Sequence, residues 1–190
     1  MAGVLASGLA GCVTTGVIPP NEESYIDRVE VVMQKPGGSV NLAEDIRVKL
    51  LAEASRYNVT GRRKALKVFV RDLHFKNPAM SLLVGDDNTI SAHVMVLDEK
   101  GNPQSSFEVS AMDRSLGTKF NGVVGAVVAG TQNPIEVERR MADALASETL
   151  EKVYGSDRAR VAQSRPPSRQ VEARYPRSYD QLRAEASAAR

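Results

Sequence analysis

Hydrophobic and polar residues alternate in four segments of the chain. Each segment predicts a β-strand, because alternate side chains of a strand point to opposite faces of a sheet. These segments are residues 24–33, 66–75, 90–96 and 107–111. The last two flank a polar turn at residues 98–103, and this arrangement predicts a β-hairpin.

Two further segments carry hydrophobic residues at three- and four-residue spacing, which predicts amphipathic helices over residues 42–57 and 134–154. Asn41 and Asn133 stand where helix N-caps are expected, and Gly155 follows the second helix as a stop. The order strand, helix, strand, strand, strand, helix predicts an α+β fold. We expect a two-layer sandwich, with a mainly antiparallel sheet and two helices on one face.

Composition and charge divide the chain into a folded part and a tail. The chain of 190 residues has 42% hydrophobic residues but no Trp, so aliphatic side chains and Ala must fill the core. Residues 155–190 contain eight Arg, no Lys and four acidic residues, together with Pro, Ser and Gln. Such a composition buries too little apolar surface to offset chain entropy. We therefore predict one domain over residues 24–154 and a disordered tail over 155–190.

An uncharged, apolar run leads from Met1 to the sole cysteine, Cys12. The tetrapeptide Leu9-Ala10-Gly11-Cys12 resembles the lipobox of bacterial lipoproteins. That resemblance implies that residues 1–11 are a signal peptide, that Cys12 becomes the first residue of the mature protein, and that it carries three acyl chains such as palmitate. Stable anchoring takes two or more acyl chains, so such a protein would stay on a membrane.

The segment 12–23 is then interpreted as a lipidated tether, because it is short and contains Thr, Gly and Pro. Val13 is not Asp, and under the sorting rule of enteric bacteria this favours the periplasmic face of the outer membrane. Residues 1–11 carry no Lys or Arg and are shorter than an ordinary secretory signal. Either the leader begins upstream of Met1, or the tetrapeptide arises by chance.

An uncharged apolar stretch at residues 122–130 lies between the last predicted strand and the last predicted helix. It is too short to span a membrane and lacks the Lys of a phosphate-binding loop. Two interpretations remain open: a surface that contacts a partner or a membrane, or a buried crossover that covers the sheet edge. The residues expected to make the contact are Gly122, Val123, Val124, Gly125, Val127, Val128 and Gly130.

The arginines of the tail admit three interpretations. The tail could be inert, could fold against an acidic partner, or could bind anionic lipid headgroups, where each Arg contributes about 1 kcal/mol. The arginines expected to contact lipid are Arg165, Arg169, Arg174 and Arg177. The net charge of +2 is too balanced to indicate a nucleic-acid-binding protein.

Catalytic and metal-binding patterns are weak in this sequence. The two histidines, His74 and His93, lie in predicted strands, and we expect both to face solvent rather than to bind a metal. Asp86-Asp87-Asn88 lacks the spacing of a calcium loop and indicates a turn. Nothing in the spacing of the residues pairs a nucleophile with a base. We therefore expect neither an enzyme nor a bound cofactor or metal.

The lipobox, the short tether, the hairpin and the Gly/Ala-rich stretch together resemble a loose group of small lipoproteins of Gram-negative bacteria. The small domain also resembles those of auxiliary lipoproteins in envelope transport systems and of curli-secretion-type lipoproteins. These resemblances imply a non-enzymatic, lipid-anchored accessory or structural protein that binds partners in the cell envelope. The alternative is a carrier of lipid or glycolipid, or an auxiliary subunit of an envelope transport system.

Overall fold

A computed structural model describes residues 15–57, 60–77, 79, 86–113, 127 and 131–166 of the chain. The elements of this part are β1 (Ser24–Met33), α1 (Leu42–Ala54), β2 (Arg62–His74), β3 (Thr89–Leu97), β4 (Pro103–Met112), α4 (Pro134–Tyr154) and α5 (Ser156–Gln163). All the predicted strands and both predicted helices are present; β1 and α4 have the predicted ends, and the ends of the other elements are shifted. The short helix α5, of eight residues against twenty-one in α4, was not predicted.

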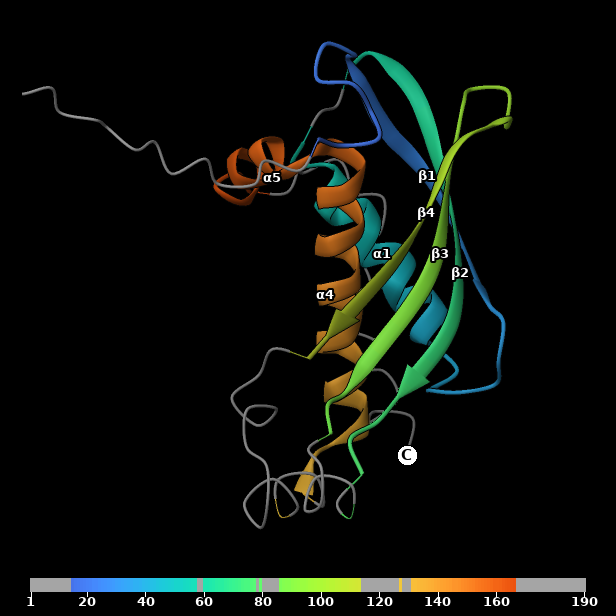
Figure 1. The fold of residues 1–190 in the computed structure, drawn as a ribbon, viewed down its shortest axis with the longest axis vertical. Helices are drawn as coiled ribbons and strands as arrows, with labels where there is room; N and C mark the ends of the chain where they lie inside the picture. Colours follow the sequence, from blue (N-terminus) through green and yellow to red (C-terminus); the bar gives the residue numbers. More distant parts are fainter. Residues whose placement is uncertain are drawn as a thin grey trace, which may run out of the picture.

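The four strands form one open sheet in the order β1-β2-β3-β4 (Figure 1). β2 pairs with β3, and β3 with β4, in antiparallel register, whereas β1 and β2 are parallel. The parallel pair follows from α1, which returns the chain to the end of the sheet where β1 began. The α+β prediction and the mainly antiparallel sheet are therefore confirmed.

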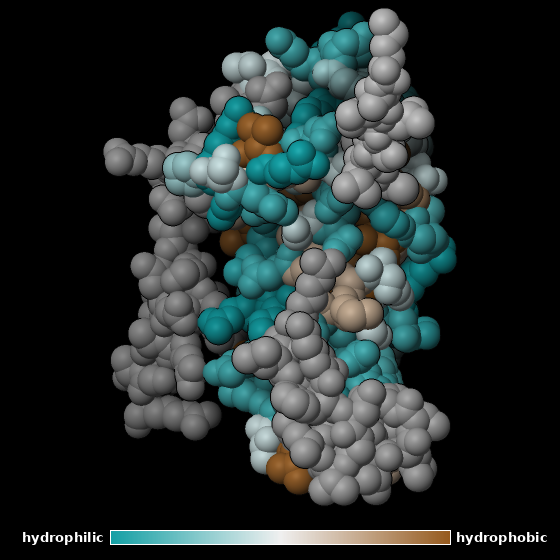
Figure 2. Space-filling model, turned by 60° about the vertical axis from the view of Figure 1, so that its left-hand side comes forward, coloured by the Kyte–Doolittle hydropathy of each residue, from teal (hydrophilic) through white to brown (hydrophobic). Residues whose placement is uncertain are grey.

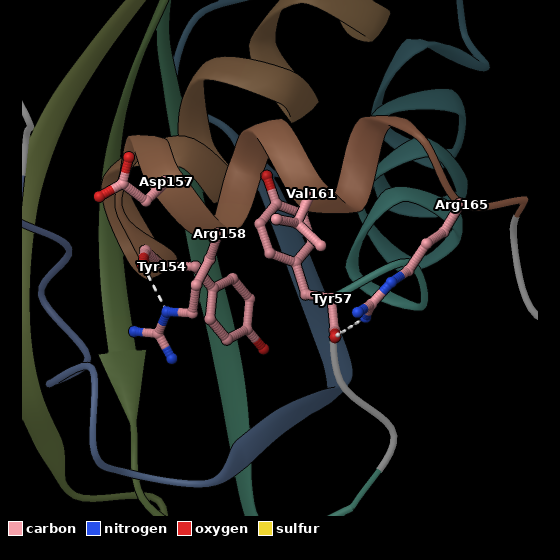
Figure 3. A pocket seen from close by; sticks show the side chains of 6 residues that line it. All are labelled: Tyr57, Tyr154, Asp157, Arg158, Val161 and Arg165. Atoms are coloured by element: carbon pink, nitrogen blue, oxygen red, sulfur yellow. Dashed lines mark hydrogen bonds between the residues drawn. The ribbon is translucent and has the colours of Figure 1, made fainter.

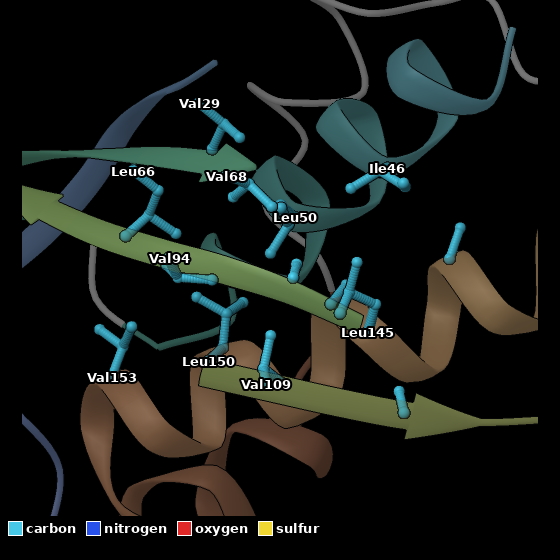
Figure 4. Close-up of a cluster of buried hydrophobic side chains, with 14 of the residues drawn as sticks. Val29, Ile46, Leu50, Leu66, Val68, Val94, Val109, Leu145, Leu150 and Val153 are labelled. Atoms are coloured by element: carbon cyan, nitrogen blue, oxygen red, sulfur yellow. The ribbon is translucent and has the colours of Figure 1, made fainter. Parts of the chain in front are cut away.

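Helices α1 and α4 cover one face of the sheet (Figure 1). The alternating residues of the central strands point at these helices, as Val68 and Val94 illustrate, and neither is exposed to solvent. Leu50 of α1 and Leu145 of α4 meet them from the helix layer (Figure 4). The core is almost entirely aliphatic, as the composition predicted.

The two predicted N-caps differ in outcome. The Asn133 side chain accepts a hydrogen bond from the backbone N–H of Ile135 at 3.1 Å, so this cap is confirmed. The side chain of Asn41 makes no capping hydrogen bond, so the prediction for α1 is wrong. Instead, the carboxylate of Glu138 on α4 accepts a hydrogen bond from the backbone N–H of Ser39, just before α1. A carboxylate from the neighbouring helix thus fixes the chain at the entrance to α1.

The regular structure continues beyond the predicted domain end at residue 154. Gly155, with φ of 88°, turns the chain from α4 into α5, which lies across the end of α4 (Figure 1). Ala159 and Ala162 of α5 are buried. Disorder is therefore the wrong prediction for residues 156–163, because two small side chains suffice to dock a short helix. Residues 167–190 of the predicted tail lie outside the described part.

Candidate functional site

The amino-terminal segment is attached directly to the end of α4. Thr15 forms a β-bridge with Gly155. The backbone N–H groups of Val17 and Ile18 donate to the carbonyls of Lys152 and Val153 at 3.0 and 2.9 Å. Ile18 is only 3% exposed and belongs to the hydrophobic core. The chain therefore enters the domain as part of its fold.

Gly16 makes this close contact sterically feasible. A Cβ at this position would lie 2.4 Å from the backbone carbonyl carbon of Tyr154, closer than real Cβ atoms approach. Lys64, buried in the sheet, adds an ion pair to Glu22 at 2.7 Å. A free tether over residues 12–23 is consequently the wrong prediction for residues 15–23. Thr, Gly and Pro suggested flexibility, but the glycine serves close packing and the backbone polar groups are paired.

Cys12, the predicted lipidation site, lies outside the described residues, as does the whole predicted leader. The sequence nevertheless limits its distance from the domain. Three residues of fully extended chain span at most about 11 Å, so Cys12 cannot lie farther than that from Thr15. The end of the domain that carries the α4–α5 junction is therefore the end nearest Cys12.

A groove lies at this same end, between the end of α1, the end of α4 and α5 (Figure 3). It is a hollow of about 380 Å³ lined by Tyr57, Tyr154, Asp157, Arg158, Val161 and Arg165. The rings of Tyr57 and Tyr154 stack with centroids 4.6 Å apart and an angle of 18° between their planes. These two rings form an aromatic floor between α1 and α4.

Two guanidinium groups flank the aromatic floor. Arg158 lies with its guanidinium carbon 5.2 Å from the centroid of the Tyr154 ring, a cation–π distance. Its Nε donates to the carbonyl of Tyr154 at 2.7 Å, and its Nη2 donates to the carbonyl of Ile18 at 2.5 Å. Arg165, on the other side, donates from Nη1 to the carbonyl of Tyr57 at 3.2 Å (Figure 3). Backbone carbonyls thus orient both cations without neutralising their charge.

The tyrosine phenols of the groove stay neutral at ordinary pH. Burial raises the pKa of Tyr57, and the nearby carboxylates of Glu53 and Glu151 add to this effect. Burial also raises the pKa of Tyr154, although the charge of Arg158 opposes it. The groove therefore presents neutral aromatic rings and two permanent positive charges. It is suited to recognising an anion beside an apolar surface.

The predicted contact residues at 122–130 are described only at Val127, whose exposed fraction is 61%. Gly122, Val123, Val124, Gly125, Val128 and Gly130 lie outside the described residues. Of the four arginines expected to contact lipid, Arg165 is placed in the groove, while Arg169, Arg174 and Arg177 lie outside the described part. The structure thus brings one residue predicted as a contact together with five groove residues that the sequence did not predict as contacts.

The two histidines lie apart and each has a carboxylate partner. His74 Nε2 is 2.7 Å from Asp86, and His93 Nδ1 is 2.9 Å from Glu108, which also pairs with Arg71. Within the described ranges, no group of three or more His, Cys, Asp or Glu side chains could hold a metal ion. Asp86 accepts a hydrogen bond from the backbone N–H of Asn77 at 2.7 Å, which is a structural role in the connection before β3.

A buried polar cluster at the opposite end of the sheet was not predicted. Asn88, just before β3, accepts a hydrogen bond from the backbone N–H of Lys76 and donates one to Gln132. Asp113, just after β4, accepts hydrogen bonds from Nε and Nη2 of Arg140 on α4 at 3.0 to 3.1 Å. This cluster fastens the ends of β2, β3 and β4 to α4, which is a role in stability.

The surface seen in Figure 2 is largely hydrophilic over the described residues, and its hydrophobic residues are scattered. None of the described helices is both long and apolar enough to cross a bilayer. Contacts made by this face are therefore expected to be mainly polar.

No protein-family model matches this chain, and a search of curated proteins gives no match. Several solved structures resemble it in part. A "putative lipoprotein" from Caulobacter crescentus aligns over 71% of this chain and 92% of its own, with 14% identity and a TM-score of 0.35. The PelC dodecamer from Paraburkholderia phytofirmans aligns over 70% of this chain and 94% of its own, with 12% identity and a TM-score of 0.38.

A third is a minor lipoprotein from Acinetobacter baumannii, which aligns over 68% of this chain and 95% of its own, with 16% identity and a TM-score of 0.34. These scores describe a partial overlap of the backbone. The site must therefore be interpreted from its own residues.

Proposed function

We propose that this protein is a lipid-anchored accessory protein of the cell envelope. In this proposal acylated Cys12 holds the domain at the periplasmic face of the outer membrane, where the domain binds an envelope partner. The observation that carries the proposal is the pairing of residues 15–18 with α4 at the first positions described after the lipobox-like tetrapeptide. An anchor at Cys12 would act on the folded domain itself.

The proposed mechanism is confinement to a surface. A domain that cannot leave the membrane meets its partner at a high effective concentration, so weak contacts become sufficient. The short distance from Cys12 to Thr15 adds orientation, because it keeps Thr15, which pairs with Gly155 at the α4–α5 junction, within about 11 Å of the anchored residue. Both effects require binding only, and the groove lining contains no Ser, Cys or His that could serve as a nucleophile or a base.

The mass of the mature amino terminus tests the anchor. The gene, with any in-frame codons upstream, is expressed in a Gram-negative host, and the membrane fraction is analysed by mass spectrometry. We expect Cys12 at the amino terminus with three acyl chains, and we expect Cys12→Ser to leave the leader uncleaved and the protein unacylated. An intact Met1 on a protein in the aqueous fraction would refute the proposal.

The binding role is tested separately by crosslinking in intact cells, followed by purification of the acylated protein. A defined envelope protein recovered in a fixed ratio supports the accessory role. Acyl chains that copurify in a fixed ratio, besides those on Cys12, would instead support the carrier that the sequence left as an alternative.

A further inference from the structure

The groove at the α4–α5 junction holds positive charge that the described carboxylates leave unbalanced. Arg158 and Arg165 make no ion pair with any described residue, and their hydrogen bonds go to backbone carbonyls. The Nη1 of Arg158, and the Nε and Nη2 of Arg165, make no hydrogen bond within the described part of the chain. Planar N–H donors that are already oriented suit a phosphate oxygen.

The one carboxylate in the groove lining belongs to Asp157. It forms an exposed ion pair with the guanidinium of Arg160 at 3.4 Å. Figure 3 shows the Asp157 side chain at the far end of the groove from Arg165. The end formed by Tyr57, Val161 and Arg165 therefore combines a guanidinium that has no ion pair among the described residues with partly apolar side chains. Val161 contributes an exposed hydrophobic side chain there.

The groove also lies close to the predicted anchor. The Nη2 of Arg158 binds the carbonyl of Ile18, which is six residues after Cys12. Six extended residues span at most about 21 Å, so the groove cannot lie far from an acylated Cys12. The headgroup layer of a bilayer begins where the hydrocarbon ends and is several Å thick. This reach allows the groove to meet the phosphate groups of the headgroup layer when Cys12 is acylated.

We propose that this groove binds the phosphate group of an anionic lipid headgroup, with Arg158 and Arg165 as the anion ligands and the stacked Tyr57 and Tyr154 as the apolar floor. The position of the groove at the membrane rests on the proposed function, whereas its phosphate chemistry does not. Free phosphate shares that chemistry, and the experiment separates the two sources.

The test uses the full chain with Cys12→Ser, so that acylation does not contribute to binding. Cosedimentation is measured with vesicles of phosphatidylcholine alone and with vesicles that also contain phosphatidylglycerol. The zwitterionic vesicles report any binding by the uncleaved leader. We expect stronger binding to the anionic vesicles, and we expect inorganic phosphate to compete with it more effectively than chloride at equal ionic strength.

Matched variants locate the binding. Arg165→Gln removes an exposed groove charge and is expected to weaken anionic binding at least about fivefold, equivalent to about 1 kcal/mol. Arg62→Gln removes the same charge from an exposed arginine of β2 that does not line the groove, and it is expected to change binding less than twofold. Tyr57→Leu leaves the charge unchanged but removes the aromatic floor, and it is expected to weaken binding severalfold while circular dichroism confirms folding.

Two results would overturn the proposal. Equal losses in Arg165→Gln and Arg62→Gln, with no loss in Tyr57→Leu, would show unspecific attraction of the protein's positive charge to the vesicles. Binding of inorganic phosphate without any preference for anionic vesicles would assign the site to a free anion. Because the assay uses unacylated protein, it can fail while the mass of the mature amino terminus still shows acylation, and the reverse also holds.

Discussion

Arg158 donates a hydrogen bond from Nη2 to the backbone carbonyl of Ile18, although 140 positions separate the two residues in the sequence. The contact joins α5 to the amino-terminal segment. The sequence did not predict α5, and we had interpreted the amino-terminal segment as a tether. It also sets the orientation of a guanidinium in the groove. One side chain thus links the structure of this end of the domain to its proposed binding role.

Replacing Arg158 tests that link. Arg158→Met keeps an apolar stem over the Tyr154 ring but leaves the carbonyls of Ile18 and Tyr154 without a charged donor. We expect the free energy of unfolding, measured by urea denaturation, to fall by about 1–3 kcal/mol. Arg160→Met is the control, because the side chain of Arg160 is 78% exposed. Equal stabilities of the two variants would contradict a structural role for Arg158.

Gly16→Ala tests how the amino-terminal segment is attached. The added methyl group would meet the backbone of Tyr154 rather than a movable side chain, so the segment must shift. We expect faster hydrogen exchange at the amides of Val17 and Ile18, and a loss of about 1–3 kcal/mol in stability. Gly37→Ala is the matched control, since its nearest neighbour would be a Leu73 methyl carbon at 4.0 Å. Unchanged exchange in Gly16→Ala would mean that the segment is not held by these hydrogen bonds.

Arg140→Leu tests the buried cluster at the other end of the sheet. The carboxylate of Asp113 is fully buried and would lose its cationic partner. We expect a loss of about 3 kcal/mol in the free energy of unfolding, because removal of one partner leaves a buried charge uncompensated. Lys35→Leu breaks the exposed pair between Lys35 and Asp72 and should cost at most about 1 kcal/mol. Similar values for both variants would contradict the role assigned to the cluster.

Leu145→Ala tests the helix layer of the core. Leu145 is fully buried against the sheet, so we expect a loss of about 2–5 kcal/mol in chemical denaturation. Ile135→Ala, at the start of the same helix, is the control because Ile135 is 44% exposed. A large effect at Ile135 would contradict the exposure that the structure gives this side chain.

We expect the protonation of the Asp86 carboxylate to lower the free energy of unfolding in acid. Burial raises its pKa, but the N–H of Asn77 and the ring of His74 together outweigh that effect, so the folded pKa lies below the ordinary value of 3.8. A depressed folded pKa contributes stability above the unfolded pKa, and this contribution is lost as the pH falls through the folded value. Urea midpoints below about pH 4 should therefore fall less steeply in Asp86→Asn than in the parent protein. Asp87→Asn is the neighbouring control and should keep the steep dependence.

The sequence predicted the layers well because burial alternates along β3 and along parts of the other strands. Every second residue of β3, from Ile90 to Val96, faces the helices and is buried. The same pattern could not say that β1 pairs with β2 in parallel. The direction in which β2 pairs with β1 depends on the end of the sheet to which α1 returns the chain, and the hydrophobic pattern does not contain this information.

The candidate site could not be predicted from the sequence because its parts come from distant segments. Tyr57 follows α1 and Tyr154 ends α4, and in the sequence each is only the last residue of a predicted helix, 42–57 or 134–154. The two arginines belong to a segment whose composition suggested disorder. The sequence nevertheless contained one usable signal. Each predicted helix ends in a tyrosine, which is consistent with the carboxyl-terminal ends of the two helices lying side by side.

The bridge between Thr15 and Gly155 also determines how the molecule would bear mechanical load. A pull applied at Cys12 reaches the domain through Thr15, and the first bonds that resist it are the bridge itself and the hydrogen bonds of Val17 and Ile18 to α4. These bonds lie beside one another on the last turn of α4, close to the Ile18 contact of Arg158. Force on Cys12 would therefore be borne first by these few hydrogen bonds at the end of α4 and only afterwards by the aliphatic core.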